Sequence, residues 1–307
     1  AIVQVHFKKL TRKIAFLINP IAGSRKGGPL QSLVAVQTEA AGLPYQIFPT
    51  VATGDYRFLE AIIQEQNFTD VVICGGDGTI NSVVAALKHL PVTFGIVPCG
   101  SGNGLALTAG IPLQPLAALE IILKSGKKQT VDAFTINNRF ACMLCGLGFD
   151  AAVAHRFAED PRRGLSTYVR KGISHFFNAP LYQFELSLQT KKATVAAWFI
   201  SVANSNQFGN RVTIAPQASL TDGLLDVVVA ASSNRLSLIW DSLKQVAGFN
   251  SLGEVDRGGK GFIYFQTDEV KIKNLNGAPL HVDGDPCETA DAFHINVIPD
   301  CFWLWVP

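Results

Sequence analysis

Short apolar runs alternate with helical patterns through the first 130 residues of the chain. Between these runs, apolar residues recur with the period of a helix, as at Leu30, Leu33 and Val34. Short buried strands that alternate with helices are typical of a parallel sheet with helices on both faces. Such sheets bind ligands at the carboxyl ends of their strands. The predicted strands are residues 14–18, 45–48, 71–74 and 93–97.

The pattern changes near residue 130, and strands dominate from there on. The pair Asn137-Asn138 predicts a tight hairpin turn. We therefore predict an α/β domain in residues 1–130 and a β-sandwich-like domain in residues 131–307, with the last strand left free to return to the first domain. The further predicted strands are residues 129–136, 139–144, 183–188, 194–203, 225–230, 262–266, 270–272 and 293–298, and the further helices are 151–158, 165–177 and 235–249.

Composition and charge narrow the class of protein. A hydrophobic content of 48% with only 16% charged residues indicates a compact globular chain. The net charge of +2 gives no support for a nucleic-acid partner. The sequence has no run of about 18 apolar residues, so we predict no membrane span. The start of the chain lacks the pattern of a signal peptide. We therefore predict a cytoplasmic protein that contacts membranes only transiently at their surface, and a homodimer is compatible with these numbers.

The six cysteines do not predict a metal or redox site. Cys142 and Cys145 have the spacing of a zinc ligand pair, but no second pair and no nearby histidine accompany them. We interpret the cysteines as small buried side chains in a reducing compartment.

The candidate chemistry begins with the loop Gly75-Gly76-Asp77-Gly78-Thr79. It follows a predicted strand and precedes a predicted helix, which together make a phosphate site, because bare backbone N–H groups and the helix dipole favour an anion. A carboxylate in such a loop would repel phosphate unless it holds a metal ion or takes a proton. Asp77 is therefore a candidate catalytic residue, and the alternative is a tight turn that merely tolerates an aspartate.

Three more segments rich in glycine or asparagine follow other strands of the first domain, at residues 19–27, 50–55 and 100–104. Together with the Asp77 loop they offer N–H groups, hydroxyls and amides for a polyphosphate. None matches a Walker P-loop, and Leu105 occupies the place of the third glycine in the dinucleotide fingerprint. A nucleotide-binding dehydrogenase is therefore disfavoured.

A set of segments from both halves of the chain occurs in the order of one known family. The segments are Asn19-Pro20, residues 75–81, residues 98–103, Pro216-Gln217-Ala218, residues 222–227 and Asp283-Gly284-Asp285. Together they resemble the diacylglycerol kinase and sphingosine kinase superfamily of ATP-dependent lipid kinases. The resemblance implies a first domain similar to NAD kinase and phosphofructokinase, and a β-sandwich that holds lipid.

The resemblance also implies roles for residues. Asp77 would act as the general base toward the lipid hydroxyl, and Asp285 would act with ATP and Mg²⁺ across the domain cleft. A larger set would hold the nucleotide. Its members are Asn19, Ser24, Lys26, Thr53, Gly75, Gly76, Gly78, Thr79, Ser101, Asn103 and Asp283.

Two further sets are implied in the second domain. Asp222, Leu224 and Asp226 are expected to hold a structural Mg²⁺, and the alternative is a turn that enters a strand with Asp226 solvated. The predicted lipid contacts are Asp150, Phe157 and Tyr168, with Asp150 facing a cationic sphingoid amine. Core packing is the alternative for the aromatic residues, and a plain surface carboxylate is the alternative for Asp150.

The chain departs from the family pattern at three positions. Ser82 stands where many bacterial members have glutamate, Gly104 follows Asn103 where many have aspartate, and Asp285 replaces the usual glutamate. These departures leave open a non-catalytic lipid- or nucleotide-binding relative. An NAD kinase-like enzyme is the other alternative, because it shares the Gly-Gly-Asp-Gly-Thr loop.

Overall fold

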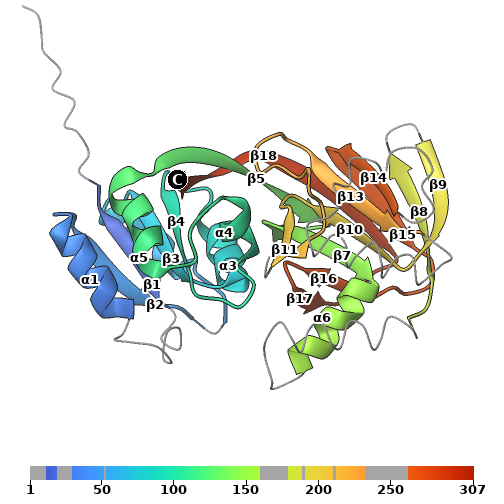
Figure 1. The fold of residues 1–307 in the computed structure, drawn as a ribbon, viewed down its shortest axis with the longest axis horizontal. Helices are drawn as coiled ribbons and strands as arrows, with labels where there is room; N and C mark the ends of the chain where they lie inside the picture. The colour runs from blue at the N-terminus through green and yellow to red at the C-terminus, as the bar shows by residue number, and fades with distance from the viewer. Residues whose placement is uncertain are drawn as a thin grey trace, which may run out of the picture.

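The structure of the protein is a computed structural model with two parts joined side by side (Figure 1). It describes residues 12–18, 30–51, 53–159, 179–188, 191–209, 212–231 and 262–307. The predicted helices at 165–177 and 235–249 lie outside these residues. Within the part of the chain that is described, no helix has both the length and the apolar character needed to span a bilayer.

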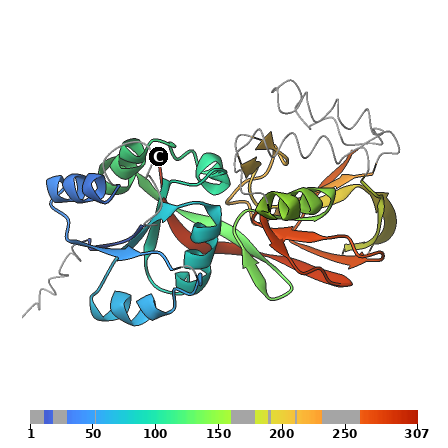
Figure 2. The same cartoon turned by 90° about the horizontal axis from the view of Figure 1, so that it is seen from below.

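The first part is the predicted α/β domain. Its four strands are parallel and lie in the order β2-β1-β3-β4, and helices cover both sides of them (Figure 2). Helices α4 and α5 follow the last of these strands and were not predicted. The strands are β1 (Ile14–Ile18), β2 (Tyr45–Pro49), β3 (Asp70–Gly75) and β4 (Thr93–Pro98). The helices are α1 (Leu30–Ala40), α2 (Phe58–Glu65), α3 (Asp77–Leu87), α4 (Gly104–Thr108) and α5 (Pro115–Glu120), the last continued by a π-helical turn (Ile121–Ser125).

The second part is the predicted antiparallel domain. Its six-stranded sheet has the order β14-β13-β10-β7-β16-β17 and packs against β5, β8, β15 and β18 of the larger sheet. Leu147 and Val227 from one side and Phe184, Ile272 and Ile295 from the other belong to the same buried apolar cluster. The elements are β5 (Lys127–Ile136), β6 (Arg139–Ala141), β7 (Leu144–Gly148), α6 (Phe149–Glu159), β8 (Tyr182–Leu188), β9 (Lys191–Ala197), β10 (Phe199–Ala203), β11 (Gln207–Gly209), β12 (Val212–Thr213), β13 (Leu225–Ala230), β14 (Phe262–Thr267), β15 (Glu269–Asn274), β16 (Leu280–Val282), β17 (Asp285–Cys287) and β18 (Ala292–Val306).

The strand predicted at 194–203 is divided in two at Trp198. β9 pairs within the larger sheet, whereas β10 belongs to the six-stranded sheet. The backbone of Trp198 donates to Ala230 and accepts from Phe149 at this corner. The change from one sheet to the other could not be predicted from the sequence, because both strands are apolar and follow each other without a polar break.

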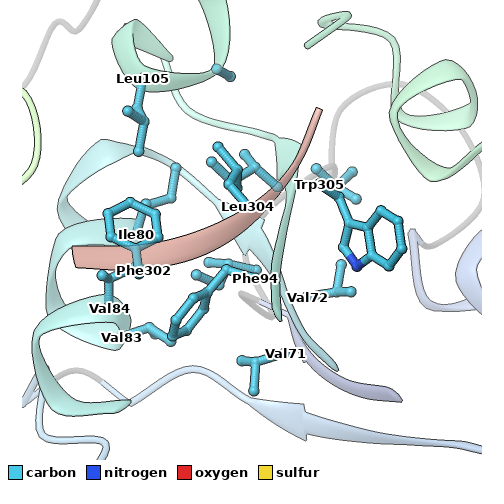
Figure 3. Close-up of a cluster of buried hydrophobic side chains, with 14 of the residues drawn as sticks. Val71, Val72, Ile80, Val83, Val84, Phe94, Leu105, Phe302, Leu304 and Trp305 are labelled. Carbon is cyan, nitrogen blue, oxygen red and sulfur yellow. The ribbon is translucent and has the colours of Figure 1, made fainter. Parts of the chain in front are cut away.

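The last strand, β18, connects the two parts. It pairs antiparallel with β5 in both of its halves. Its first half also pairs antiparallel with β15, and its second half pairs parallel with β4 through Trp303 and Leu304. Phe302 packs edge-to-face against Phe94, with ring centroids 5.7 Å apart (Figure 3). The strand predicted at 293–298 therefore continues to Val306, which makes one sheet of ten strands.

A buried aspartate at the start of β3 secures this return. Asp70 is fully buried, and its Oδ1 accepts from Arg12 Nη2 at 2.9 Å and from Trp305 Nε1 at 2.6 Å. Its Oδ2 accepts from Thr69 Oγ1 at 2.5 Å and from Arg12 Nε at 3.3 Å. The guanidinium also lies 4.3 Å from the Trp305 ring centroid. The carboxylate thus ties an early residue and the last strand to the central strand.

Candidate active site

The Asp77 loop has the predicted strand, turn and helix. β3 ends at Gly75, Gly76 is the extended N-cap residue, and α3 begins at Asp77. A Cβ atom on Gly100 would lie only 2.6 Å from the Cα of Gly76. The β3–α3 and β4–α4 loops therefore meet backbone to backbone, and a side chain at either glycine would force them apart.

The neighbouring β4–α4 loop is shaped by Asn103. This residue has a φ of 53° and is 8% exposed. Its Oδ1 accepts from the Gly100 N–H at 2.9 Å, and its Nδ2 donates to the Gly100 carbonyl at 2.9 Å. The amide is therefore used to hold the loop, while Ser101 is exposed at its tip. Contact of either side chain with a nucleotide stays a prediction.

Asp77 lies between these two loops. Burial is the largest influence on its carboxyl group and raises its pKa above the ordinary value. The backbone N–H groups of Gly104, Leu105 and Asn103 oppose this shift. Among the described residues, Oδ1 is buried and has no hydrogen-bond partner. This carboxyl group takes up a proton more readily than an ordinary aspartate, and its Oδ1 is available for a ligand.

The second domain places the Asp283-Gly284-Asp285 turn opposite this loop. Asp285 is exposed, and its Oδ2 lies 3.1 Å from the position that a Cβ atom on Gly78 would occupy. The turn therefore reaches the first turn of α3, next to Asp77. The predicted members Asp77 and Asp285 come from different domains, and the fold brings them together.

Asp283 has a different environment from Asp285. It is 6% exposed, and its carboxylate accepts from the N–H groups of Cys142, Met143 and Leu144, each at 2.9 Å. Burial and, to a lesser extent, the charge of Asp77 together raise its pKa to about 6, against the effect of these three donors. In this conformation Asp283 holds the segment before β7, so its predicted contact with a nucleotide stays a prediction.

Residues that the sequence did not single out also make polar contacts here, between the two domains and within the second domain. Thr108 of α4 donates to Asn206 Oδ1 at 3.0 Å. Asn204 is fully buried and donates through Nδ2 to the carbonyls of Asp132 at 2.7 Å and Cys142 at 3.0 Å. A signal for these residues existed, because residues 204–206 form a polar run directly after an apolar strand.

The predicted metal ligands lie apart from Asp77, on β13 and the turn before it. Asp226 is fully buried, so the alternative in which it is solvated is wrong. Tyr264 donates to its Oδ1, while Oδ2 has no partner within the described part of the chain. Burial and the Asp222 charge raise its pKa to about 7, although a hydrogen bond from Gln266 opposes them.

The turn before β13 supplies the other two predicted ligands. Asp222 is exposed, and its Oδ1 accepts from the Leu224 N–H at 3.1 Å. Oδ2 of Asp132 on β5 accepts a hydrogen bond from the Gly223 N–H at 2.8 Å. No cluster of three or more histidine, cysteine or acidic side chains occurs among the described residues. A metal at this turn would therefore need carbonyl or water ligands in addition to the two carboxylates.

Some of the remaining predicted residues lie within the described part of the structure, and the others lie outside it. Thr53 is exposed, and the neighbouring Gly54 lies beside the Ser82 hydroxyl of α3. Asp150 is 7% exposed and lies 3.4 Å from His281, so its carboxylate is engaged within the protein. Outside the described part of the structure are Asn19, Ser24, Lys26, Tyr168 and the side chain of Phe157.

Comparisons with known proteins match each of the two domains to a described family. Residues 13–136 match the family described as "Diacylglycerol kinase catalytic domain", and residues 144–305 match "YegS C-terminal NAD kinase beta sandwich-like domain". The chain is 28% identical to the probable lipid kinase YegS-like of Chromohalobacter salexigens, over 83% of this chain and 81% of the relative. It is 24% identical to the diacylglycerol kinase of Bacillus subtilis, over 94% and 96%.

A solved structure shares the whole fold. The crystal structure of a diacylglycerol kinase from Bacillus anthracis superposes with a TM-score of 0.73 and covers 98% of each chain at 19% identity. This likeness concerns the fold, and the family matches concern the two domains separately.

Proposed function

Because the chain belongs to the diacylglycerol kinase family and carries its YegS-type C-terminal domain, we propose that it transfers the γ-phosphate of ATP to a hydroxyl of a diacylglycerol-like or sphingoid lipid. The observation that carries the proposal is the Asp77 carboxyl. It lies at the start of a helix, between two glycine loops, with a raised pKa and one buried oxygen without a partner in the described chain. Most buried side-chain oxygens in folded proteins have a hydrogen-bond partner, so the unpaired oxygen supports a role in binding or catalysis.

In the proposed reaction Asp77 is the general base. It takes the proton of the lipid hydroxyl while that oxygen forms a bond to the γ-phosphorus. The bond from this phosphorus to the bridging oxygen breaks, and ADP leaves. Phosphoryl transfer depends mainly on placement and charge neutralisation, and general-base assistance contributes roughly 10²–10⁴-fold.

The phosphates are held at the glycine loops in this proposal. Backbone N–H groups at the start of α3 face the anion, and their dipole favours it. The residues that we propose to contact ATP are Asn19, Ser24, Lys26, Thr53, Gly75, Gly76, Gly78, Thr79, Ser101, Asn103 and Asp283. Asp283 could contact ATP only if its carboxylate gave up hydrogen bonds from the N–H groups of residues 142–144. We therefore expect that its main contribution is to hold this segment in shape.

Mg²⁺ fits two places by its preference for oxygen ligands. Asp285 offers an exposed carboxylate beside α3. Asp226 offers a buried oxygen without a protein partner in the described chain, next to Asp222 and the backbone of Leu224. A bound ion would neutralise charge on phosphate oxygens at the first place and on two carboxylates at the second. The second site is structural in this proposal.

The acceptor lipid is proposed to bind on the second domain. We propose contacts with Phe157 and Tyr168, and a location in the cytoplasm with transient membrane contact. For Asp150 the engagement with His281 favours a role within the protein over recognition of a free cationic amine.

The proposal is tested by transfer of label from γ-labelled ATP, with Mg²⁺, to diacylglycerol, monoacylglycerol, sphingosine, ceramide, phosphatidylglycerol and NAD⁺. We expect label in one or more of the lipids and none in NAD⁺. Label in NAD⁺ alone would overturn the choice of acceptor. Bound ATP without any labelled acceptor would overturn the proposed activity in favour of a binding protein.

A further inference from the structure

A buried histidine–aspartate contact lies beside the site, and the reaction described above does not use it. His281 of β16 is fully buried, and its Nε2 lies 3.4 Å from Oδ2 of Asp150 at the start of α6. The other oxygen, Oδ1, accepts from the Ala151 N–H at 2.8 Å. Asp150 is therefore held at the first turn of its own helix and directed at the imidazole.

The hydrogen bond at the other ring nitrogen defines the tautomer of the imidazole. The N–H of Gly284 donates to Nδ1 of His281 at 3.3 Å. Nδ1 is then an acceptor, so the ring proton is on Nε2, which is the nitrogen that faces Asp150. The imidazole links helix α6 to the backbone of the Asp283-Gly284-Asp285 turn.

The position between the two side chains is occupied by a glycine. Gly146 of β7 is paired with His281 across the sheet. A Cβ atom on Gly146 would lie 1.9 Å from Oδ2 of Asp150 and 2.5 Å from Nε2 of His281. The contact between helix and strand therefore requires glycine at this position, since any side chain would occupy the space in which the pair meets.

The turn that His281 contacts is a two-residue hairpin between β16 and β17. Its central residues, Asp283 and Gly284, have φ values of 50° and 86°, as in the hairpin turns that match strand twist. His281 pairs with Pro286 at the base of the hairpin, and the next pair includes Asp285. A support at Gly284 therefore helps to fix the position of Asp285, the first residue of β17.

We propose that His281 and Asp150 are positioning residues that hold this turn so that Asp285 reaches the first turn of α3. This inference rests on the proposed kinase function, because Asp285 was assigned there to the reaction. The path of contacts runs from Asp150 through His281 and Gly284 to Asp285, which lies beside Gly78. Neither positioning residue needs to touch ATP or lipid.

Stability alone does not account for the pair. The removal of two charged or polar groups from water costs more than an imperfectly aligned contact returns, and well-packed apolar residues would fold as well or better. The Nε2–Oδ2 distance of 3.4 Å is a close polar contact without good hydrogen-bond alignment. The contact orients the imidazole ring of His281, and the orientation of the ring places Nδ1 where it accepts from the Gly284 N–H.

The chain offers a matched control for the experiment. His155 of α6 also contacts β16, through Nε2 to the Leu280 carbonyl at 2.9 Å, but it does not contact the turn. His281→Gln keeps a group that reaches Asp150 and removes the acceptor for Gly284. We expect this variant to lower kcat by roughly 10–100-fold, as for a displaced catalytic group, with KM for ATP changed less than about twofold. His155→Gln should leave kcat within about twofold.

A double-mutant cycle decides whether the effect passes through Asp285. In an Asp285→Asn background, His281→Gln should cost less than about threefold more, because the group that it positions is already disabled. Asp150→Asn should resemble His281→Gln in both backgrounds. Losses that multiply independently of Asp285 would overturn the proposal.

A readout that needs no enzymatic activity completes the test. Amide hydrogen exchange at Gly284 should speed up by roughly tenfold or more in His281→Gln and stay unchanged in His155→Gln. Equal exchange in both variants would overturn the positioning role even if the wild-type chain phosphorylates no lipid. If the wild type transfers no label but exchange responds as expected, the proposed reaction fails while the support of the turn stands.

Discussion

Strand β3 has one aspartate at its start and another two residues after its end, and the two have opposite environments. Asp70 is fully buried, and both of its oxygens accept from charged or polar donors of Arg12, Thr69 and Trp305. Asp77 has a buried oxygen without a partner in the described chain, and its pKa is raised by burial. The same residue type thus stands at both ends of one element.

The difference separates stability from chemistry. A saturated carboxylate with a guanidinium partner holds segments together and has no capacity left for a ligand. An unsaturated carboxylate at the carboxyl end of a parallel strand costs stability and is available to take a proton. We expect substitutions at Asp70 to change mainly the free energy of unfolding and substitutions at Asp77 to change mainly turnover.

The largest expected effect is on turnover in Asp77→Asn. Loss of the base should lower kcat by roughly 10³-fold. The free energy of unfolding should stay the same or rise, because the raised pKa means that ionisation of Asp77 destabilises the folded state. Label transfer and urea unfolding on one preparation measure both quantities. A variant that keeps more than a tenth of the wild-type kcat would contradict the role of base.

The next effect is on stability in Asp70→Asn. The substitution leaves the Arg12 guanidinium without its buried carboxylate, and breaking such a pair costs about 3–5 kcal/mol. Urea unfolding measures the loss, and kcat of the folded fraction should change less than about threefold. Trp305→Phe removes one donor and should cost about 1–3 kcal/mol. An Asp70 variant of unchanged stability would contradict the comparison.

A smaller effect is expected where the two loops beside Asp77 touch. Gly100→Ala places a Cβ atom 2.6 Å from the Gly76 Cα, so the loops must separate. We expect KM for ATP to rise by roughly tenfold, about 1.4 kcal/mol. Gly42→Ala is the control, because no atom lies within 4 Å of its Cβ position and its φ of 66° confines the cost to stability. Equal KM values in both variants would exclude a nucleotide role for this contact.

The smallest effect concerns Asp226, which has one occupied and one unoccupied oxygen. Its folded pKa of about 7 exceeds the ordinary 3.8. Its contribution to stability is therefore full below the ordinary pKa and is lost as the pH rises through about 7. Mg²⁺ should raise Tm by about 2–4 °C at pH 8 and by less at pH 5.5, because the ion competes with the proton.

The matched variant makes the Mg²⁺ prediction specific. Asp226→Asn should have a higher Tm than the wild type at pH 8 without the ion, since no charge is buried, and Mg²⁺ should no longer raise it. A Tm shift that persists in Asp226→Asn would place the ion elsewhere. Asp222→Asn should weaken the shift without abolishing it, because Asp222 is exposed.

The sequence predicts those features of the fold and of the site whose signals lie within a few neighbouring residues. The Asp77 loop is a strand, a glycine turn and a helix start within a few residues, and each has its own sequence signal. The contact between Asp70 and Trp305 joins residues 235 positions apart, and no local pattern predicts that pairing. Asp283 was assigned from its motif, but its three backbone donors depend on how the hairpin meets β7.

The most direct test of the account is the pH dependence of kcat for lipid phosphorylation by the wild-type chain. Asp77 must be ionised to act as a base, and burial raises its pKa. We expect kcat to fall as the pH is lowered, along an acid limb whose midpoint lies above 3.8, the ordinary pKa of aspartate. Asp283 is close enough to shift that midpoint, so the limb reports the pair. A kcat that stays constant from about pH 8 down to the acid limit of folding would contradict a catalytic carboxylate at this site.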